Sequence, residues 1–242
     1  MDALARVALT AFEVPALVAL ELWVPRRRAP VQWRVIVAAA AMLAINTVVV
    51  HALTVVPASD TAIRVVGAWV LVEVTAYWMH RAMHAVPWLW RFHRMHHAPG
   101  PVAWHRSWWI HPVDIALFVV AADVACWIAG APNAAGWFVV VRRMWSLLLH
   151  ANIRWPRSAI DHLVVTPSFH DRHHREDLAP ANFAGNFAIV DRVFGTWRPG
   201  VAGSQHGATA ESWLATGGEN PTPSDDCARE DRPEHRSHAR RS

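Results

Sequence analysis

The chain has 242 residues, of which 53% are hydrophobic and only 17% are charged, so its composition excludes a disordered or fibrous protein and argues against a soluble enzyme. Its length suits a single domain, and two cysteines, Cys126 and Cys227, are too few for a disulfide framework. The formal charge of +4 comes from arginine without any lysine and lies partly in an arginine-rich tail, so it does not indicate nucleic-acid binding. The 16 histidines are the feature that needs an explanation.

Four apolar segments run along the chain. No small-residue cleavage site follows the first, at residues 5–24, and we expect no removable signal peptide. The second, 35–57, is long enough as a helix to cross a hydrocarbon layer of about 30 Å, and 62–79 is predicted as a third span. The fourth, 113–141, is interrupted at 130–133 by Gly-Ala-Pro-Asn, which fits either two short helices or a re-entrant hairpin.

Arginines mark every second connection between these segments. This is the positive-inside pattern, which puts the N-terminus outside and residues 80–112 and 142 onward in the cytosol. We therefore predict an all-α fold, a polytopic membrane helical bundle with a cytosolic histidine-rich helical cap. A soluble protein in which the same segments are buried core helices is the alternative. The basic connections contain Arg26, Arg27, Arg28 and Arg34, then Arg81, Arg91, Arg94 and Arg106, then Arg142, Arg143, Arg154 and Arg157.

Most of the histidines fall into three spaced clusters. Helical positions i, i+3 and i+4 are neighbours, so we expect each cluster to present its imidazoles on one face, toward one spot. Neutral imidazole is a common ligand for transition metals, and eight such nitrogens exceed the four that one zinc ion takes. The spacing therefore predicts two metal ions. The clusters are His80 and His84, then His93, His96 and His97, then His170, His173 and His174.

The first histidine cluster and His51 each suggest a further function. The first cluster carries Arg81 where the zinc-protease pattern His-Glu-x-x-His has glutamate, which removes the general base of that mechanism. His51 lies inside the second span, where a polar residue is either functional or hydrogen-bonded within the packing.

The motifs between residues 60 and 198 resemble the fatty acid hydroxylase / sterol desaturase superfamily of integral membrane di-iron enzymes. The resemblance divides the chain into N-terminal membrane spans at 1–59, a fatty acid hydroxylase-like di-iron domain at 60–200 and a tail at 201–242. The tail is polar and aperiodic, and we expect it to be disordered. The matching motifs are Tyr77-Trp78-Met79-His80-Arg81, Leu89-Trp90-Arg91, His111-Pro112-Val113-Asp114, His150-Ala151-Asn152, Thr166-Pro167, Asn182, Gly185-Asn186 and Asp191-Arg192-Val193-Phe194-Gly195-Thr196.

The resemblance implies which histidines bind iron. Some relatives place a further histidine one turn from the ninth ligand, but here Ser146 and Arg154 stand at those positions, so His111, His162 or a water completes the coordination. We favour a structural role for His111 before its proline and a surface position for His162, and no role is assigned to His105. The implied ligands are His80, His84, His93, His96, His97, His170, His173 and His174, with His150 as the ninth.

Several other residues receive structural roles. Asp191 and the turn at 194–196 are expected to lock the C-terminal segment under the metal site, and Asn182 is expected to support it. Aromatic residues near the span ends fit a membrane–water interface. They are Tyr77, Trp78, Trp88, Trp90, Trp108 and Trp109.

The resemblance implies an O2-dependent oxidoreductase that hydroxylates or desaturates a C–H bond of a lipid at a di-iron centre. No catalytic residue beyond the metal ligands and no other bound cofactor is expected. Because no Rossmann glycine pattern or haem-attachment motif occurs, electrons must come from a separate ferredoxin, cytochrome or reductase. We expect an integral protein of a bacterial cell membrane with the histidine clusters on the cytosolic side. The alternatives are a zinc-dependent membrane hydrolase and a non-enzymatic metal-binding membrane protein.

Overall fold

The structure, a computed structural model, describes residues 16, 18–23, 33–53, 61–97, 103–132, 134–155, 158–175 and 178–200. Within these ranges the protein is helical and contains no strand, which confirms the all-α prediction for this part of the chain. The α-helices are α2 (Trp33–Leu53), α3 (Ala62–Ala85), α4 (Pro87–His93), α5 (Pro112–Ile128), α6 (Ala134–Leu149), α7 (Pro167–His173) and α8 (Ile189–Val193), and two 3₁₀ helices are η1 (Trp104–Trp108) and η2 (Ala159–His162).

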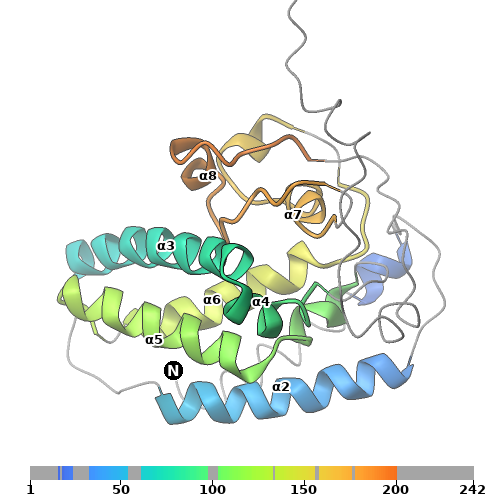
Figure 1. Cartoon of the computed structure of the whole chain (residues 1–242), viewed down its shortest axis with the longest axis horizontal. Coiled ribbons are helices and arrows are strands. Elements are labelled where there is room, and N and C mark those ends of the chain that lie inside the picture. Colours follow the sequence, from blue (N-terminus) through green and yellow to red (C-terminus); the bar gives the residue numbers. More distant parts are fainter. Residues whose placement is uncertain are drawn as a thin grey trace, which may run out of the picture.

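The long helices form a layer in which α5 lies between α2 and α3 (Figure 1). Small side chains line the contact between α3, α5 and the start of α6, which lets the helix backbones approach closely. α7 and α8 lie on the other side of α3 from α5 (Figure 1). The buried residues of the first contact are Ala68, Val72, Ala122, Ala125, Cys126, Ala131, Ala134, Ala135 and Phe138.

The interrupted fourth segment forms two helices, α5 and α6, an arrangement that both two short spans and a re-entrant hairpin allow. The break falls at Gly130, whose φ of +69° lies in the left-handed region that glycine adopts readily. The second helix extends beyond the apolar segment that ends at residue 141, because α6 continues through Arg142 and Arg143 to Leu149. The side chain of Arg142 lies 4.0 Å from the carboxylate of Glu73 on α3, so the helix accommodates this charge inside the layer.

Three helices that carry or support the histidine clusters, α4, α5 and α7, begin at proline, which is favoured at the first helical position. At the start of α5, the Nδ1 atom of His111 accepts a hydrogen bond from the N–H group of Val113, at 3.1 Å. At the start of α7, the hydroxyl of Thr166 accepts from the N–H group of Phe169. His111 therefore caps a helix, which confirms its structural role.

Among the described residues, one helix, Ala62–Ala85, is long and apolar enough to cross a membrane, and Ile36–Val49 is a shorter apolar stretch. The predicted span at 62–79 therefore corresponds to an apolar helix, whereas the polytopic bundle and the three domain boundaries stay predictions. Residues 54–60, most of the segment 5–24 and the tail 201–242 lie outside the described residues, as does the side chain of His51.

Candidate metal centre

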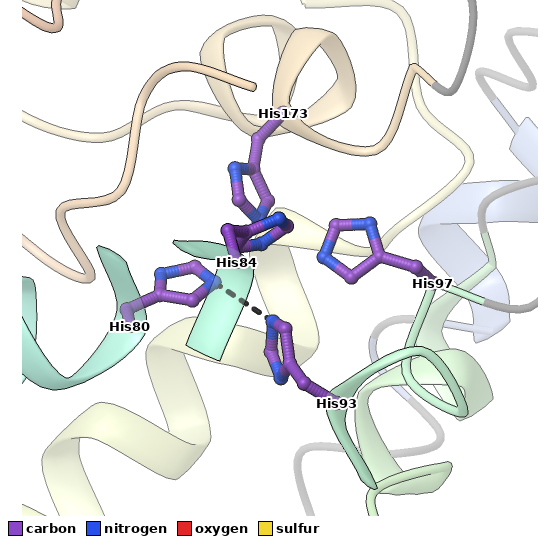
Figure 2. A group of neighbouring side chains, drawn as sticks. All are labelled: His80, His84, His93, His97 and His173. Carbon is purple, nitrogen blue, oxygen red and sulfur yellow. Dashed lines mark hydrogen bonds between the residues drawn. The ribbon is translucent and has the colours of Figure 1, made fainter. Parts of the chain in front are cut away.

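Five histidines converge where the end of α3 meets α4 and α7. His80 and His84 come from α3, His93 from the last residue of α4, His97 from the turn that follows, and His173 from α7. Each offers one ring nitrogen, and these atoms all lie within 4.8 Å of one another. Figure 2 shows the five rings facing a common centre. We call these residues the first histidine group.

Four further histidines form a second histidine group beside the first. His96, His150, His170 and His174 also offer ring nitrogens within 4.8 Å of one another, and all four side chains are buried. The two groups are in contact, because the rings of His97 and His174 stack with their centroids 4.4 Å apart. All nine histidines predicted from the sequence are thus members of one of two adjacent groups.

The expectation that each sequence cluster points at one spot is wrong for the second and third clusters. His93 and His97 join the first group, whereas His96, between them in the sequence, joins the second. His170 and His174 likewise share the second group, and His173 joins the first. Side chains four residues apart stay together, but those three apart in these clusters diverge to different groups. Each of these clusters therefore links the two groups.

Hydrogen bonds at Nδ1 fix the tautomer of three members of the first group. The Nδ1 atom of His80 donates to the carbonyl of Phe183 at 2.7 Å, and that of His173 donates to the carbonyl of Ala181 at 2.8 Å. The Nδ1 atom of His93 donates to a carboxylate oxygen of Asp114 at 3.0 Å. A neutral imidazole that donates from Nδ1 carries a lone pair on Nε2. All three Nε2 atoms are therefore free to act as metal ligands.

The facing Nε2 atoms cannot bond to each other in these tautomers. The Nε2 atoms of His80 and His93 lie only 3.1 Å apart (dashed line in Figure 2) with a lone pair on each. The Nε2 atoms of His84, His97 and His173 are buried without a hydrogen-bond partner among the described residues. Buried polar atoms normally find a partner, so this arrangement indicates that a cation belongs between them.

The second group also brings ring nitrogens close together around an acceptor nitrogen. The Nδ1 atom of His150 donates to the carbonyl of Ser146 at 2.7 Å, which leaves its Nε2 as an acceptor. That Nε2 lies 3.2 Å from the Nε2 atoms of His96, His170 and His174. Two nitrogens bound at about 2.1 Å to one ion, at right angles to each other, would be separated by about 3.0 Å. The spacing of both groups therefore fits metal ligation.

Burial keeps the ring nitrogens available to a metal. It lowers the pKa of His150 to about 4 and that of His173 to about 3, against an ordinary value near 6.5. Burial and then neighbouring histidines also hold the pKa values of His96, His97 and His174 well below that value. Neutral imidazole is the form that binds metals, so protons do not compete for these ligands near pH 7.

A single backbone segment, 181–184, braces histidines of the first group. Its carbonyls at 181 and 183 accept from His173 and His80, as described above. The carboxylate of Asp191 accepts from the N–H groups of Phe183 and Ala184 at 2.8 and 2.7 Å, and from the hydroxyl of Thr196 at 2.7 Å. The expected locking role of Asp191 and its neighbouring turn is thereby confirmed.

Asn182 supports the same segment from within. Its φ of +62° lies in the left-handed region, which asparagine tolerates better than most residues. Its side-chain amide donates to the carbonyls of Phe169 and Arg198, both at 3.1 Å, and its side-chain oxygen accepts from the N–H group of Arg198 at 2.7 Å. Asn182 is therefore structural, as predicted.

The remaining described histidines lie outside both groups. His162 is exposed and stacks on Trp197, with ring centroids 4.6 Å apart, which confirms its surface position. His105 lies on η1, and burial followed by the nearby Arg106 lowers its pKa to about 4. Sequence reasoning missed Asp114 as the partner of His93, although an acidic residue two positions after proline in the His-Pro motif was visible.

A cavity of about 160 Å³ opens beside both histidine groups, between α3, α5 and α6. His80 and His93 of the first group line it, as do His96, His150 and His170 of the second. Its other walls are largely apolar, with a few polar side chains at the edges. The apolar lining includes Leu43, Val72, Ala76, Trp108, Ile110, Ile115, Phe118, Val119, Ala122, Phe138, Val139 and Leu149.

This chain belongs to the fatty acid hydroxylase family, whose family model matches residues 65–196. The match contains all nine histidines and the braces described above. Known relatives share this region: the chain is 30% identical over 139 residues to an ornithine lipid hydroxylase, OlsE, of Rhizobium tropici, covering 56% of this chain and 42% of that protein.

Two other relatives have names that refer to different substrates. The chain is 30% identical over 138 residues to the very-long-chain aldehyde decarbonylase GL1-11 of Oryza sativa subsp. indica, covering 55% of this chain and 52% of that protein. It is 27% identical over 144 residues to an alkylglycerol monooxygenase of Danio rerio, covering 54% of this chain and 30% of that protein. The chain thus spans about half the length of these relatives or less, and no solved structure matches it.

Proposed function

We propose that this protein is a membrane enzyme that uses two iron ions and O2 to oxidise a C–H bond of a lipid, by hydroxylation or desaturation. The observation that carries the proposal is the pair of adjacent histidine groups whose ring nitrogens converge within 4.8 Å, with the Nε2 lone pairs of His80 and His93 facing each other. His80, His84, His93, His97 and His173 would hold one ion, and His96, His150, His170 and His174 the other.

Two irons held by these histidines would supply O2 activation. In hydroxylation one oxygen atom would enter the C–H bond and the other would leave as water, and in desaturation both would leave as water, with two electrons and two protons from a donor in either case. The chain's own residues prepare this chemistry. Phe183, Ala181, Asp114 and Ser146 fix the ligand tautomers through their oxygen atoms. The buried, neutral imidazoles also exclude water from the centre.

The cavity supports a lipid as the substrate class. Its walls are mostly apolar and it reaches histidines of both groups, so an alkyl segment that entered it would contact the metal centre. The relatives include enzymes named for ornithine lipids and alkylglycerols, both of which contain hydrocarbon chains. We propose a lipid as the substrate class of this chain, without assigning either of these particular lipids to it.

The outer faces of the helices support a membrane location. α2, α3 and α5 expose large apolar side chains that would be costly in water and favourable in a bilayer. The arginine pattern would place the histidine groups on the cytosolic side, where a separate ferredoxin, cytochrome or reductase could donate electrons. The exposed side chains include Val37 and Val48 on α2, Ile63, Val66 and Val70 on α3, and Val120, Val124 and Trp127 on α5.

The proposal is tested by metal content and lipid products together. Purified protein should contain two irons per chain, and cells that express it should contain lipids that have gained one oxygen or lost two hydrogens. His173→Ala removes a ligand of the first group and should abolish both iron loading at that group and lipid oxidation, whereas the exposed His162→Ala should retain both. A protein that binds zinc and hydrolyses lipids without O2, or one that binds metal without changing any lipid, would overturn the proposal.

A further inference from the structure

Besides Asp114 and Arg143, the cavity lining contains the guanidinium of Arg142, a charged group that a purely apolar lipid would not need. It extends from α6 into the helical layer and lines the cavity together with Phe118, Val139 and Ser146. A Cβ atom at Gly185 would overlap its Nη1 atom, so the guanidinium lies directly against the backbone there. Nη1 is buried and has no hydrogen-bond partner among the described residues.

The charge of Arg142 is only partly compensated. The nearest carboxylate, that of Glu73, is 4.0 Å from Nη1, which is the outer limit of an ion pair and too long for a hydrogen bond. Glu73 is instead bound by Asn186, whose side-chain amide donates to Oε1 at 2.8 Å and whose N–H group donates to Oε2 at 3.3 Å. The Arg142 side chain is 23% exposed, but its Nη1 atom is buried without a hydrogen-bonded anion, so a ligand oxygen at this position would be favoured.

The guanidinium is also close to the metal centre. It packs over the ring of Phe118 at 5.2 Å, and the same ring lies 6.3 Å from the ring of His80, centroid to centroid. His80 and His170 line the same cavity as Arg142. The positive group therefore lies beside the reacting end of the cavity.

The size of the cavity limits what can enter. A cavity of about 150 Å³ holds a molecule the size of benzene, so the 160 Å³ here fits a polar group with a short piece of chain rather than a whole lipid. The remainder of the lipid must lie outside it.

We propose that Arg142 binds an anionic oxygen group of the lipid substrate, a carboxylate or a phosphate, and holds the polar end of the lipid inside the cavity. This inference rests on the proposed function, because it names the substrate class of the same site. Its consequence is that the oxidised carbon lies near the anionic end of the lipid and not at the far end of its hydrocarbon chain.

Binding of three ligands with the same alkyl chain tests the proposal. Dodecanoate, dodecyl phosphate and dodecanol are titrated calorimetrically into the metal-loaded full chain in neutral detergent, with wild type, Arg142→Gln and Arg154→Gln compared. Arg154 is exposed and away from the cavity, so its variant changes the charge equally and serves as the control. Comparing variants for the same ligand cancels the partitioning of that ligand into micelles.

Arg142→Gln should weaken binding of at least one anion about 10- to 100-fold, the effect of losing a hydrogen bond to a charged group, and leave dodecanol binding unchanged. Arg154→Gln should behave as wild type. Loss of dodecanoate alone or dodecyl phosphate alone identifies which anion the site takes. Equal losses for all three ligands, or no loss for either anion, would overturn the proposal.

Glu73→Gln provides a second variant with the opposite expected sign. Glutamine keeps an oxygen for Asn186 but removes the partial compensation of Arg142, so the affinity for the anion should rise several-fold. Unfolding of Arg142→Gln would leave this variant decisive, because an unchanged or lower anion affinity in Glu73→Gln would contradict the proposal.

The two proposals fail separately. Iron loading with O2-dependent lipid oxidation but no preference for anions would leave the oxygenase standing and remove the role of Arg142. An Arg142-dependent preference for anions in a protein that does not oxidise lipids would support the role of Arg142 and remove the oxygenase proposal.

Discussion

The Nδ1 atom of His93 donates a hydrogen bond to Oδ2 of Asp114 at 3.0 Å, and both side chains are almost fully buried. Carboxylates that orient a metal-binding histidine typically contribute a factor of 10–100 to metal affinity. Asp114→Asn should therefore lower the affinity of the first histidine group for its metal by about that factor. Competition with a chelator during metal titration measures it.

Asp123→Asn provides the matched control for that variant. It makes the same substitution on the same helix, but Asp123 belongs to neither histidine group and does not line the cavity. It should bind metal as the wild type does. Equal metal affinities in Asp114→Asn and wild type would show that His93 does not depend on this carboxylate.

His96 and His97 are adjacent in the sequence but belong to different histidine groups. His97→Ala should remove metal from the first group and His96→Ala from the second, so each variant should bind one ion per chain in place of two. The double variant should bind none with high affinity. Metal analysis after gel filtration measures the ratio, and loss of both ions in either single variant would point to one shared site.

Asp191 accepts three hydrogen bonds that hold residues 183, 184 and 196 in place. Asp191→Asn replaces one acceptor oxygen with a donor, which should lower the free energy of unfolding by about 1–3 kcal/mol. Because Phe183 orients His80, metal affinity at the first group should fall as well. Thermal unfolding with and without metal separates the two effects, and an unchanged midpoint would contradict the role of Asp191.

The lowered pKa values of His150 and His173 predict how the metal-free protein responds to acid. In the unfolded chain these groups titrate near pH 6.5, whereas in the folded protein they titrate at about 4 and about 3. Below pH 6.5 the unfolded chain therefore binds more protons, and the free energy of unfolding should fall as the pH decreases toward 4.

Thermal midpoints of the chelator-treated protein between pH 8 and pH 5 measure this dependence. The surface variant His162→Asn should retain it. A midpoint that stays constant or rises between pH 6.5 and pH 5 would show that the buried histidines do not titrate in this way.

The spacing of the histidines predicted eight members of the two groups, because metal ligation requires close donors and helical periodicity supplies them, and the family resemblance added His150 as the ninth. The spacing did not predict how the groups divide the clusters, since that depends on how the chain packs around them. Residues that orient the ligands, such as Asp114 and Phe183, are distant in sequence from their partners and are brought near only by packing.

The apolar segments predicted the long helices but not the length of α6. A hydropathy pattern ends a span at the first pair of arginines, whereas α6 carries Arg142 past that point because Glu73 faces it from α3. Whether a helix continues past a charged residue depends on the partner of that charge, and Glu73 is far from Arg142 in the sequence.

The proposed function requires that the two histidine groups hold iron and activate O2 toward a lipid. Incubating the iron-loaded protein with membranes, a reductant and ¹⁸O2 tests this most directly by mass spectrometry of the extracted lipids. We expect a lipid that carries one ¹⁸O atom, or one that has lost two hydrogens with ¹⁸O released as water, and no such product from His173→Ala. Product containing oxygen from solvent water alone, or turnover that continues without O2, would contradict it.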